Sequence, residues 1–255
     1  MLVDRHAADS YAAYAEGAMH RAAAGGFTLL LHPPTALDTQ SQARMSQLLD
    51  ANRFAGALAA LGDGAPPLSA APSPAPIIAV GIERDTSSGC SVVVDEELGG
   101  LIAGRHLLNL GCRRLLVAGG GVSPRASARA AGIRRAVQEF TNAEWVNDWA
   151  AKLNSTGEQS QSAQIREPDG LIVMRLDSGG TTKDALPMST GKSRNLPTVA
   201  FDDRALSNDA LPQVVHILPA AEQMGSTAVD LLLQELDDPL HDHVVVAVCP
   251  ELLEG

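Results

Sequence analysis

Short apolar runs rich in Val, Ile and Leu alternate along the chain with longer alanine-rich segments whose apolar positions recur at helical spacing. Apolar runs of about four to eight residues predict buried strands, and the longer segments predict amphipathic helices. Alternation of strands and helices is typical of a parallel sheet covered by helices on both faces. The pattern therefore predicts an α/β protein throughout.

The individual elements can be placed from this pattern and from glycine and proline positions. Glycines follow the first and third helices, at Gly25-Gly26 and at Gly111, where they are expected to end them. Residues 62–76 contain five prolines and predict an exposed loop. Helices are expected at 11–24, 41–53, 96–110, 127–140 and 220–236, and strands at 2–4, 27–32, 54–61, 77–82, 90–97, 115–120, 171–174, 196–203 and 244–250.

Composition and charge narrow the functional classes. The 255 residues include 30 acidic and 19 basic side chains, giving a net charge of −11, and no dense run of Lys or Arg offers a surface for phosphates. Acidic and basic residues interrupt residues 1–20, so this segment is expected to form neither a signal peptide nor a membrane span. Three widely spaced cysteines suit buried thiols in a reducing compartment. We expect a soluble, cytoplasmic protein that does not bind DNA by itself and contacts no membrane.

Enzyme and metal signatures fit poorly. Gly119–Gly121 follows a predicted strand, but a dinucleotide fingerprint would need glycine where Pro124 stands. Gly191-Lys192-Ser193 lacks the earlier glycine of a phosphate loop, and no G-x-S-x-G elbow occurs. His241-Asp242-His243 could hold a metal, but the segment reads more readily as a surface turn. We therefore expect no catalytic site, no cofactor and no metal.

Six segments occur in an order that matches a known family across nearly the whole chain. They are 11–31, 92–120, the S-x-R-x-x-G-I run at 127–133, Asp148-Trp149, LPTVAFDD at 196–203 and 217–233. Each segment alone could occur by chance, but together they resemble the effector-binding core of the lactose-repressor (LacI/GalR) family of transcriptional regulators.

This resemblance implies a periplasmic-binding-protein-like fold with two lobes, each a parallel sheet flanked by helices, and a ligand cleft between them. The N-terminal lobe would comprise 1–93 plus 218–242, and the C-terminal lobe 94–217 plus 243–255. The family's DNA-reading headpiece would precede these lobes. Met1 falls about where the first core strand begins, so we expect the headpiece to be missing and operator DNA to be reached only through it.

The resemblance also implies ligand-binding residues. Arg129 matches an arginine that hydrogen-bonds ligand hydroxyls or a carboxylate, and Asp202 matches an acceptor for ligand hydroxyls. Trp149 matches an aromatic residue that stacks on the ligand, and Tyr11 matches an aromatic residue at the start of the first helix. The alternative for each is a structural role: a surface arginine, a capping aspartate, or core packing.

Several positions depart from the family pattern. Ala8-Asp9 replaces the usual Asn-Pro before the first helix, Leu176-Asp177 replaces Asn-Asp, and Glu96 replaces the Asn that follows the strand aspartate. Amide groups that commonly bind sugars are therefore replaced.

The leading hypothesis is a core that senses a small sugar-like or nucleoside-like effector, forms a homodimer through helices 41–53 and 96–110, and couples effector binding to DNA binding by the headpiece. Two rivals stand beside it. One is a solute-binding protein of a transporter with the same fold, and the other is an α/β enzyme that uses the Gly119–Gly121 loop on a nucleotide.

Overall fold

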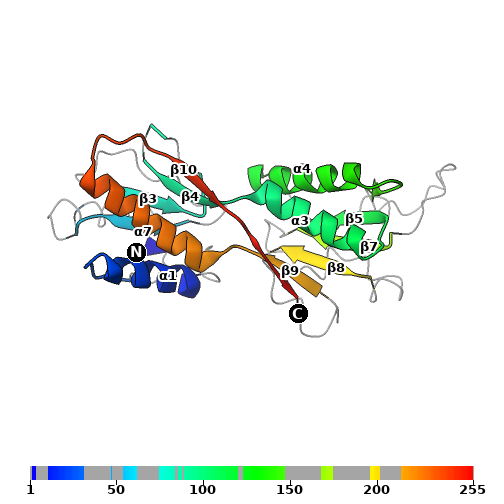
Figure 1. Cartoon of the computed structure of the whole chain (residues 1–255), viewed down its shortest axis with the longest axis horizontal. Helices are drawn as coiled ribbons and strands as arrows, with labels where there is room; N and C mark the ends of the chain where they lie inside the picture. Colours follow the sequence, from blue (N-terminus) through cyan, green and yellow to red (C-terminus); the bar gives the residue numbers. More distant parts are fainter. Residues whose placement is uncertain are drawn as a thin grey trace. The chain divides into compact units, whose positions relative to one another are not determined.

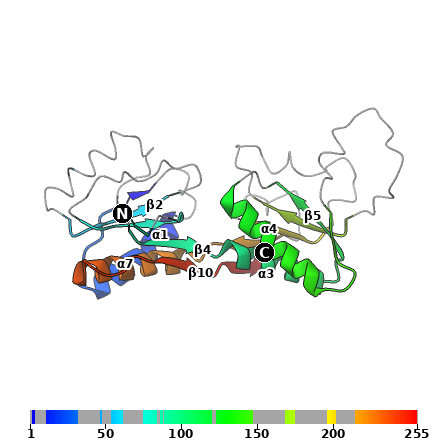
Figure 2. The same ribbon diagram turned by 90° about the horizontal axis from the view of Figure 1, so that it is seen from above.

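The fold was analysed in a computed structural model of the chain, shown in two orthogonal views in Figures 1 and 2. It divides into two compact units, Met1–Val94 with Pro219–Val248 and Asp95–Leu218 with Cys249–Gly255. Among the described residues, no helix is both long enough and apolar enough to cross a membrane. The structure describes residues 2–3, 11–31, 47, 54–61, 75–83, 86–87, 89–119, 123–146, 168–174, 196–201 and 214–254.

The first unit is built on a parallel sheet. Its described strands lie in the order β1-β2-β3-β4-β10, and every neighbouring pair is parallel. Because both faces of such a sheet are covered, its strands carry Ala, Val and Ile with little alternation. In chain order they are β1 (Leu2–Val3), β2 (Ala57–Ala60), β3 (Ile77–Val80), β4 (Ser91–Val94) and β10 (Val245–Val248).

Two helices cover one face of this sheet, α1 (Tyr11–Ala24) and α7 (Ala221–Asp237), and they lie side by side in Figure 1. Their backbones approach closely at two glycines. A Cβ atom on Gly17 would lie 1.9 Å from the carbonyl oxygen of Glu222, and one on Gly225 would lie 2.1 Å from that of Tyr14. The helix pair can therefore form only with glycine at both positions.

The second unit carries a mixed sheet. Its described strands lie in the order β11-β9-β8-β7-β5-β6, and all neighbours are parallel except β11, which runs antiparallel to β9. In chain order they are β5 (Arg114–Ala118), β6 (Glu144–Val146), β7 (Gly170–Val173), β8 (Thr198–Phe201), β9 (Val214–Leu218) and β11 (Glu251–Glu254).

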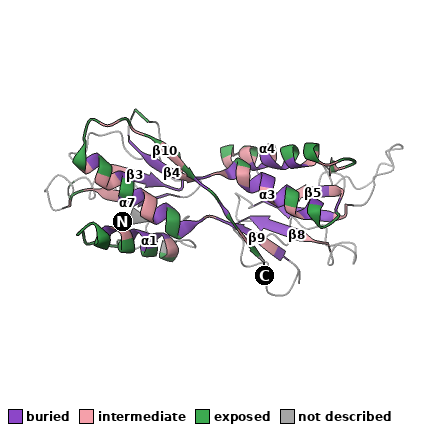
Figure 3. Ribbon diagram, in the orientation of Figure 1, coloured by how far each residue is buried: buried purple, intermediate pink, exposed green. Residues whose placement is uncertain are grey.

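Helices α3 (Glu96–Asn109) and α4 (Pro124–Glu139) cover one face of this second sheet with their buried sides, which are purple in Figure 3. Each begins with a side-chain cap. Asp95 accepts a hydrogen bond from the backbone N–H of Leu98 at 2.9 Å, and the Ser123 hydroxyl accepts one from that of Ala126 at 3.1 Å.

The two helices of the second unit are also joined by an exposed ion pair. The Arg105 guanidinium donates two hydrogen bonds to the Glu139 carboxylate, from Nε at 2.6 Å and from a terminal nitrogen at 2.8 Å. These bonds lower the pKa of Glu139 and raise that of Arg105.

The thiol of Cys112 lies in the core of the second unit. Burial is the main cause that raises its pKa, and the charge of Asp169 raises it further. A buried, protonated Cys112 is a core residue.

The predicted α/β class is confirmed, and three details are corrected. The helix expected at 127–140 begins at Pro124, because Ser123 caps it and proline suits the first helical position. Residues 27–31 form no strand, and Phe27 and Leu30 are exposed. The sequence pattern did not predict strands β6, β9 and β11.

The last strands also change the predicted lobe boundaries. Residues 243–255 were assigned to the C-terminal lobe, but Val245–Val248 pairs with β4 in the first unit. The chain enters the second unit only at Cys249, where Pro250 separates β10 from β11. Periodicity identified the apolar run but could not choose between two sheets that both offer an edge.

Candidate functional site

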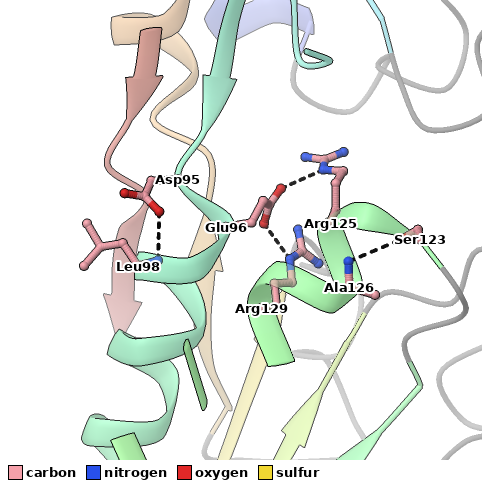
Figure 4. A network of polar contacts seen from close by, with 7 residues as sticks. All are labelled: Asp95, Glu96, Leu98, Ser123, Arg125, Ala126 and Arg129. Carbon is pink, nitrogen blue, oxygen red and sulfur yellow. Dashed lines mark hydrogen bonds and ion pairs between the residues drawn. The ribbon is translucent and has the colours of Figure 1, made fainter. Parts of the chain in front are cut away.

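In the second unit, acidic and basic side chains meet where α3 and α4 begin (Figure 4). Glu96 is the first residue of α3 and is only 8% exposed. Arg125 and Arg129 lie four residues apart on α4, so they project from the same face of that helix. The cluster therefore joins the first turn of α3 to the first two turns of α4, its neighbour in space.

A single carboxylate serves both arginines. Arg125 donates from Nε to Oε1 of Glu96 at 2.6 Å, and Arg129 donates from Nε to Oε2 at 2.6 Å. The side chains of Arg129 and Glu96 are 7% and 9% exposed, whereas that of Arg125 is 27% exposed. Charge-assisted bonds of this length are strong, and burial removes the water that would otherwise screen them. Two guanidiniums and one carboxylate leave the three residues with one positive charge.

The position of Arg129 in the fold is suited to ligand contact. Its guanidinium carbon lies 4.4 Å from the centre of the Phe201 ring, and Phe201 is the last residue of β8. Strands β5, β7 and β8 are parallel, so their carboxyl ends share one edge of the sheet. Ligands of open α/β sheets bind outside that edge. Arg129 is therefore held at the carboxyl edge, paired with Glu96 and with its guanidinium carbon over an aromatic ring.

Of the predicted site residues, Arg129 alone can be assessed through its side chain. Tyr11 begins α1 in the first unit, but its side chain lies outside the described residues. Trp149 and Asp202 also lie outside them, although Asp202 follows Phe201 directly in the sequence.

Glu96 and Arg125 are the residues that sequence reasoning missed. Glu96 was noted only as a substitute for an amide, and Arg125 was not singled out. The available signal was the spacing of Arg125 and Arg129 by four residues, which places two like charges on one helix face and calls for a carboxylate between them.

The match to a family model agrees with the fold. The model for the periplasmic binding protein-like domain matches residues 105–255. No curated protein sequence matches the chain significantly.

Similar solved structures agree with this match. The Cra transcriptional dual regulator from Pseudomonas putida in complex with fructose 1-phosphate has a TM-score of 0.66 and 20% identity, over 99% of this chain and 97% of that one. A putative ribose operon repressor from Burkholderia thailandensis has a TM-score of 0.68 and 19% identity, and the match covers 100% of this chain and 98% of that one. A periplasmic binding protein/LacI transcriptional regulator from Alkaliphilus metalliredigens, complexed with D-xylulofuranose, has a TM-score of 0.63 and 19% identity, over 99% and 96%. These likenesses confirm the predicted periplasmic-binding-protein-like fold.

Proposed function

The chain belongs to the periplasmic binding protein-like domain family, and from that premise we propose that it is the effector-sensing core of a LacI-type transcriptional regulator. The observation that carries the proposal is the Arg129–Glu96 pair at the carboxyl edge of the second sheet. A ligand-binding domain of this family needs hydrogen-bonding groups fixed before the ligand arrives, and the 2.6 Å ion pair fixes one.

The proposed effector is a small polyhydroxylated molecule, sugar-like or nucleoside-like. A guanidinium supplies N–H donors in a planar fork, and the carboxylate of Asp202 would supply an acceptor for hydroxyl groups. The carbohydrates named in two of the similar structures support this class of ligand.

The test is a thermal-shift panel on the purified chain, with neutral sugars, sugar phosphates, nucleosides and nucleotides. A binding effector raises the melting temperature because it stabilises only the folded state. We expect a sugar or nucleoside to do so. Stabilisation by nucleotides alone would favour the rival hypothesis of an α/β enzyme that acts on a nucleotide.

The ligand found by this panel then tests the site. Arg129→Lys keeps the charge but loses the fork, so we expect affinity to fall about tenfold or more. Arg135→Gln is the matched control, because Arg135 lies on the same helix with a side chain 61% exposed, and its affinity should equal that of the wild type. Equal affinities in all three proteins would mean that the ligand binds elsewhere.

A regulator and a transport protein of the same fold differ in what surrounds the core. The regulator would work in the cytoplasm as a homodimer, with α3 and residues 41–53 at the dimer surface; the second segment lies outside the described residues apart from Gln47. Light scattering should give twice the monomer mass. A coding sequence for a helix-turn-helix upstream of Met1 would support the regulator, and one for a secretion signal would support a solute-binding protein.

A further inference from the structure

Three side chains with metal-binding atoms meet in the first unit, whereas the arginine cluster belongs to the second. Cys90 precedes β4, Glu235 lies in the last turns of α7, and His241 lies in the turn that leads to β10. Their sulfur, carboxylate oxygen and ring nitrogen atoms all lie within 4.8 Å of one another. From sequence, His241 stood in a surface turn with no partner at a familiar metal-ligand spacing.

The separation of the sulfur and nitrogen atoms suits a shared metal ion. Cys90 Sγ lies 3.3 Å from His241 Nε2. Zinc bonds of about 2.3 Å to sulfur and 2.0 to 2.1 Å to nitrogen, at a tetrahedral angle, place these two atoms about 3.6 Å apart. A shift of a few tenths of an ångström would therefore open the pair around an ion.

The orientation of the His241 ring is already that of a ligand. Its Nδ1 lies 2.8 Å from the carbonyl oxygen of Asp238. A carbonyl oxygen only accepts hydrogen bonds, so Nδ1 carries a proton, and in the neutral ring the lone pair is then on Nε2, the atom 3.3 Å from the sulfur. Histidines that bind metal are commonly fixed in this way by a backbone carbonyl. His243 packs edge-on against the His241 ring, with centroids 5.2 Å apart.

The other two ligands supply negative charge in a buried place. Cys90 is fully buried, and its sulfur accepts a hydrogen bond from the backbone N–H of Val244 at 3.3 Å, a contact that stabilises a thiolate. Glu235 is 9% exposed and accepts a 3.4 Å hydrogen bond from the backbone N–H of Cys90. Within the described part of the chain, no Lys or Arg forms an ion pair with Glu235. A buried carboxylate without a cation is costly, and a divalent ion would remove that cost.

We propose that Cys90, Glu235 and His241 bind a Zn²⁺ ion, with a water molecule as the fourth ligand. The thiolate and carboxylate together balance the two charges of the ion, and the mixed S, N and O donors are those that zinc accepts. The ion would tie the start of β4 to the end of α7 and to the turn before β10. All three protein ligands belong to the first unit, whereas Arg129 belongs to the second.

The experiment is zinc titration of the full, reduced, metal-free chain against a chromophoric chelator, with Co²⁺ as a spectroscopic probe. We expect one equivalent of zinc to bind, and the cobalt form to show a thiolate-to-metal charge-transfer band. His241→Gln, in a partly exposed turn, should lower zinc affinity about a hundredfold. Cys90→Ser should abolish the cobalt band.

Matched controls are Cys249→Ser and His20→Gln, which replace the same residue types at exposed positions. Both should bind zinc like the wild type. The proposal fails if the wild-type chain takes up no zinc at saturation, if bound cobalt shows no thiolate band, or if His241→Gln retains full affinity. His241→Gln keeps the test decisive even if Cys90→Ser does not fold, because its turn lies at the surface. None of these outcomes depends on whether an effector is found.

Discussion

At the scale of single residues, the arginine expected to meet a ligand already has a counterion in its own chain. The Nε–H of Arg129 donates a 2.6 Å hydrogen bond to the Glu96 carboxylate. The guanidinium carbon of Arg129 also lies over the Phe201 ring, 4.4 Å from its centre. Glu96 therefore positions Arg129 and limits the positive charge that an effector meets.

The first prediction follows from the sharing of one carboxylate. Glu96→Gln removes the charge with little change of volume and leaves two guanidiniums facing a neutral amide. We expect the free energy of unfolding to fall by about 2 to 4 kcal/mol, because one of these ion pairs is buried. Urea unfolding followed by circular dichroism measures this.

The adjacent residue provides the control for this prediction. Glu97 is 54% exposed and pairs with Arg135 only at 3.9 Å. Glu97→Gln should therefore change the unfolding free energy by less than about 0.5 kcal/mol. Equal losses in the two variants would show that Glu96 contributes no more than a surface charge.

Sequence reasoning identified one half of this pair. Arg129 was found because its spacing to Gly132 and Ile133 matches a family motif. Glu96 stands 33 residues earlier, and only the contact between α3 and α4 reveals that its carboxylate pairs with this arginine. The site's remaining predicted residues, Trp149, Asp202 and the Tyr11 side chain, stay predictions.

At the scale of elements, α3 and α4 are held together by backbone contact. A Cβ atom on Gly100 would lie 2.0 Å from the carbonyl oxygen of Arg129, and one on Gly132 would lie 1.9 Å from that of Glu97. The glycines let two helices approach more closely than any side chain allows. The same approach brings Glu96 within reach of Arg129, so the helix contact and the ion pair depend on each other.

The second prediction tests this contact with Gly132→Ala. Overpacking against a backbone atom costs about 3 kcal/mol, which exceeds the roughly 1 kcal/mol that alanine gains over glycine in a helix. We expect a net loss of about 2 kcal/mol in unfolding free energy, measured by urea unfolding.

Ser127→Ala is the control, since Ser127 is exposed on the same helix. It should leave stability within about 0.5 kcal/mol of the wild type. A Gly132→Ala protein as stable as the wild type would mean that the helices separate at no cost.

Most elements could be placed from periodicity, because buried strands and amphipathic helices leave different apolar spacings. The failures have physical causes. Residues 27–31 are apolar enough for a buried strand but pair with no described strand. Strand β11, with two glutamates and two leucines, lies at a sheet edge, where one face can stay polar and the apolar signal is weak.

At the scale of the whole molecule, neither unit is a continuous stretch of chain. The chain passes between the units after Val94, after Leu218 and after Val248. Val245 of β10 must pair with Ser91 of β4, so the first sheet is completed only near the end of the chain. Pairings this distant in sequence slow folding, and a fragment that ends before β10 would leave the edge of β4 open.

The third prediction concerns the whole surface and follows from the net charge of −11. When Lys and Arg side chains neutralise DNA phosphates, the counterions condensed on the DNA are released, and this release supplies much of the binding free energy. An acidic chain without a basic surface gains no such binding free energy. In fluorescence anisotropy at about 0.15 M salt, the chain should leave a labelled duplex unbound, with or without an effector.

Lowering the salt provides the decisive comparison. A basic DNA-binding protein, used as the positive control, should bind more tightly as salt falls, whereas this chain should stay unbound because weaker screening lengthens the reach of its repulsion. Salt-dependent binding by the chain itself would place DNA contacts within the core and would remove the need for a headpiece. No binding at any salt concentration leaves the proposed coupling dependent on a separate DNA-reading module, in which an effector acts only through its different affinities for two arrangements of the core.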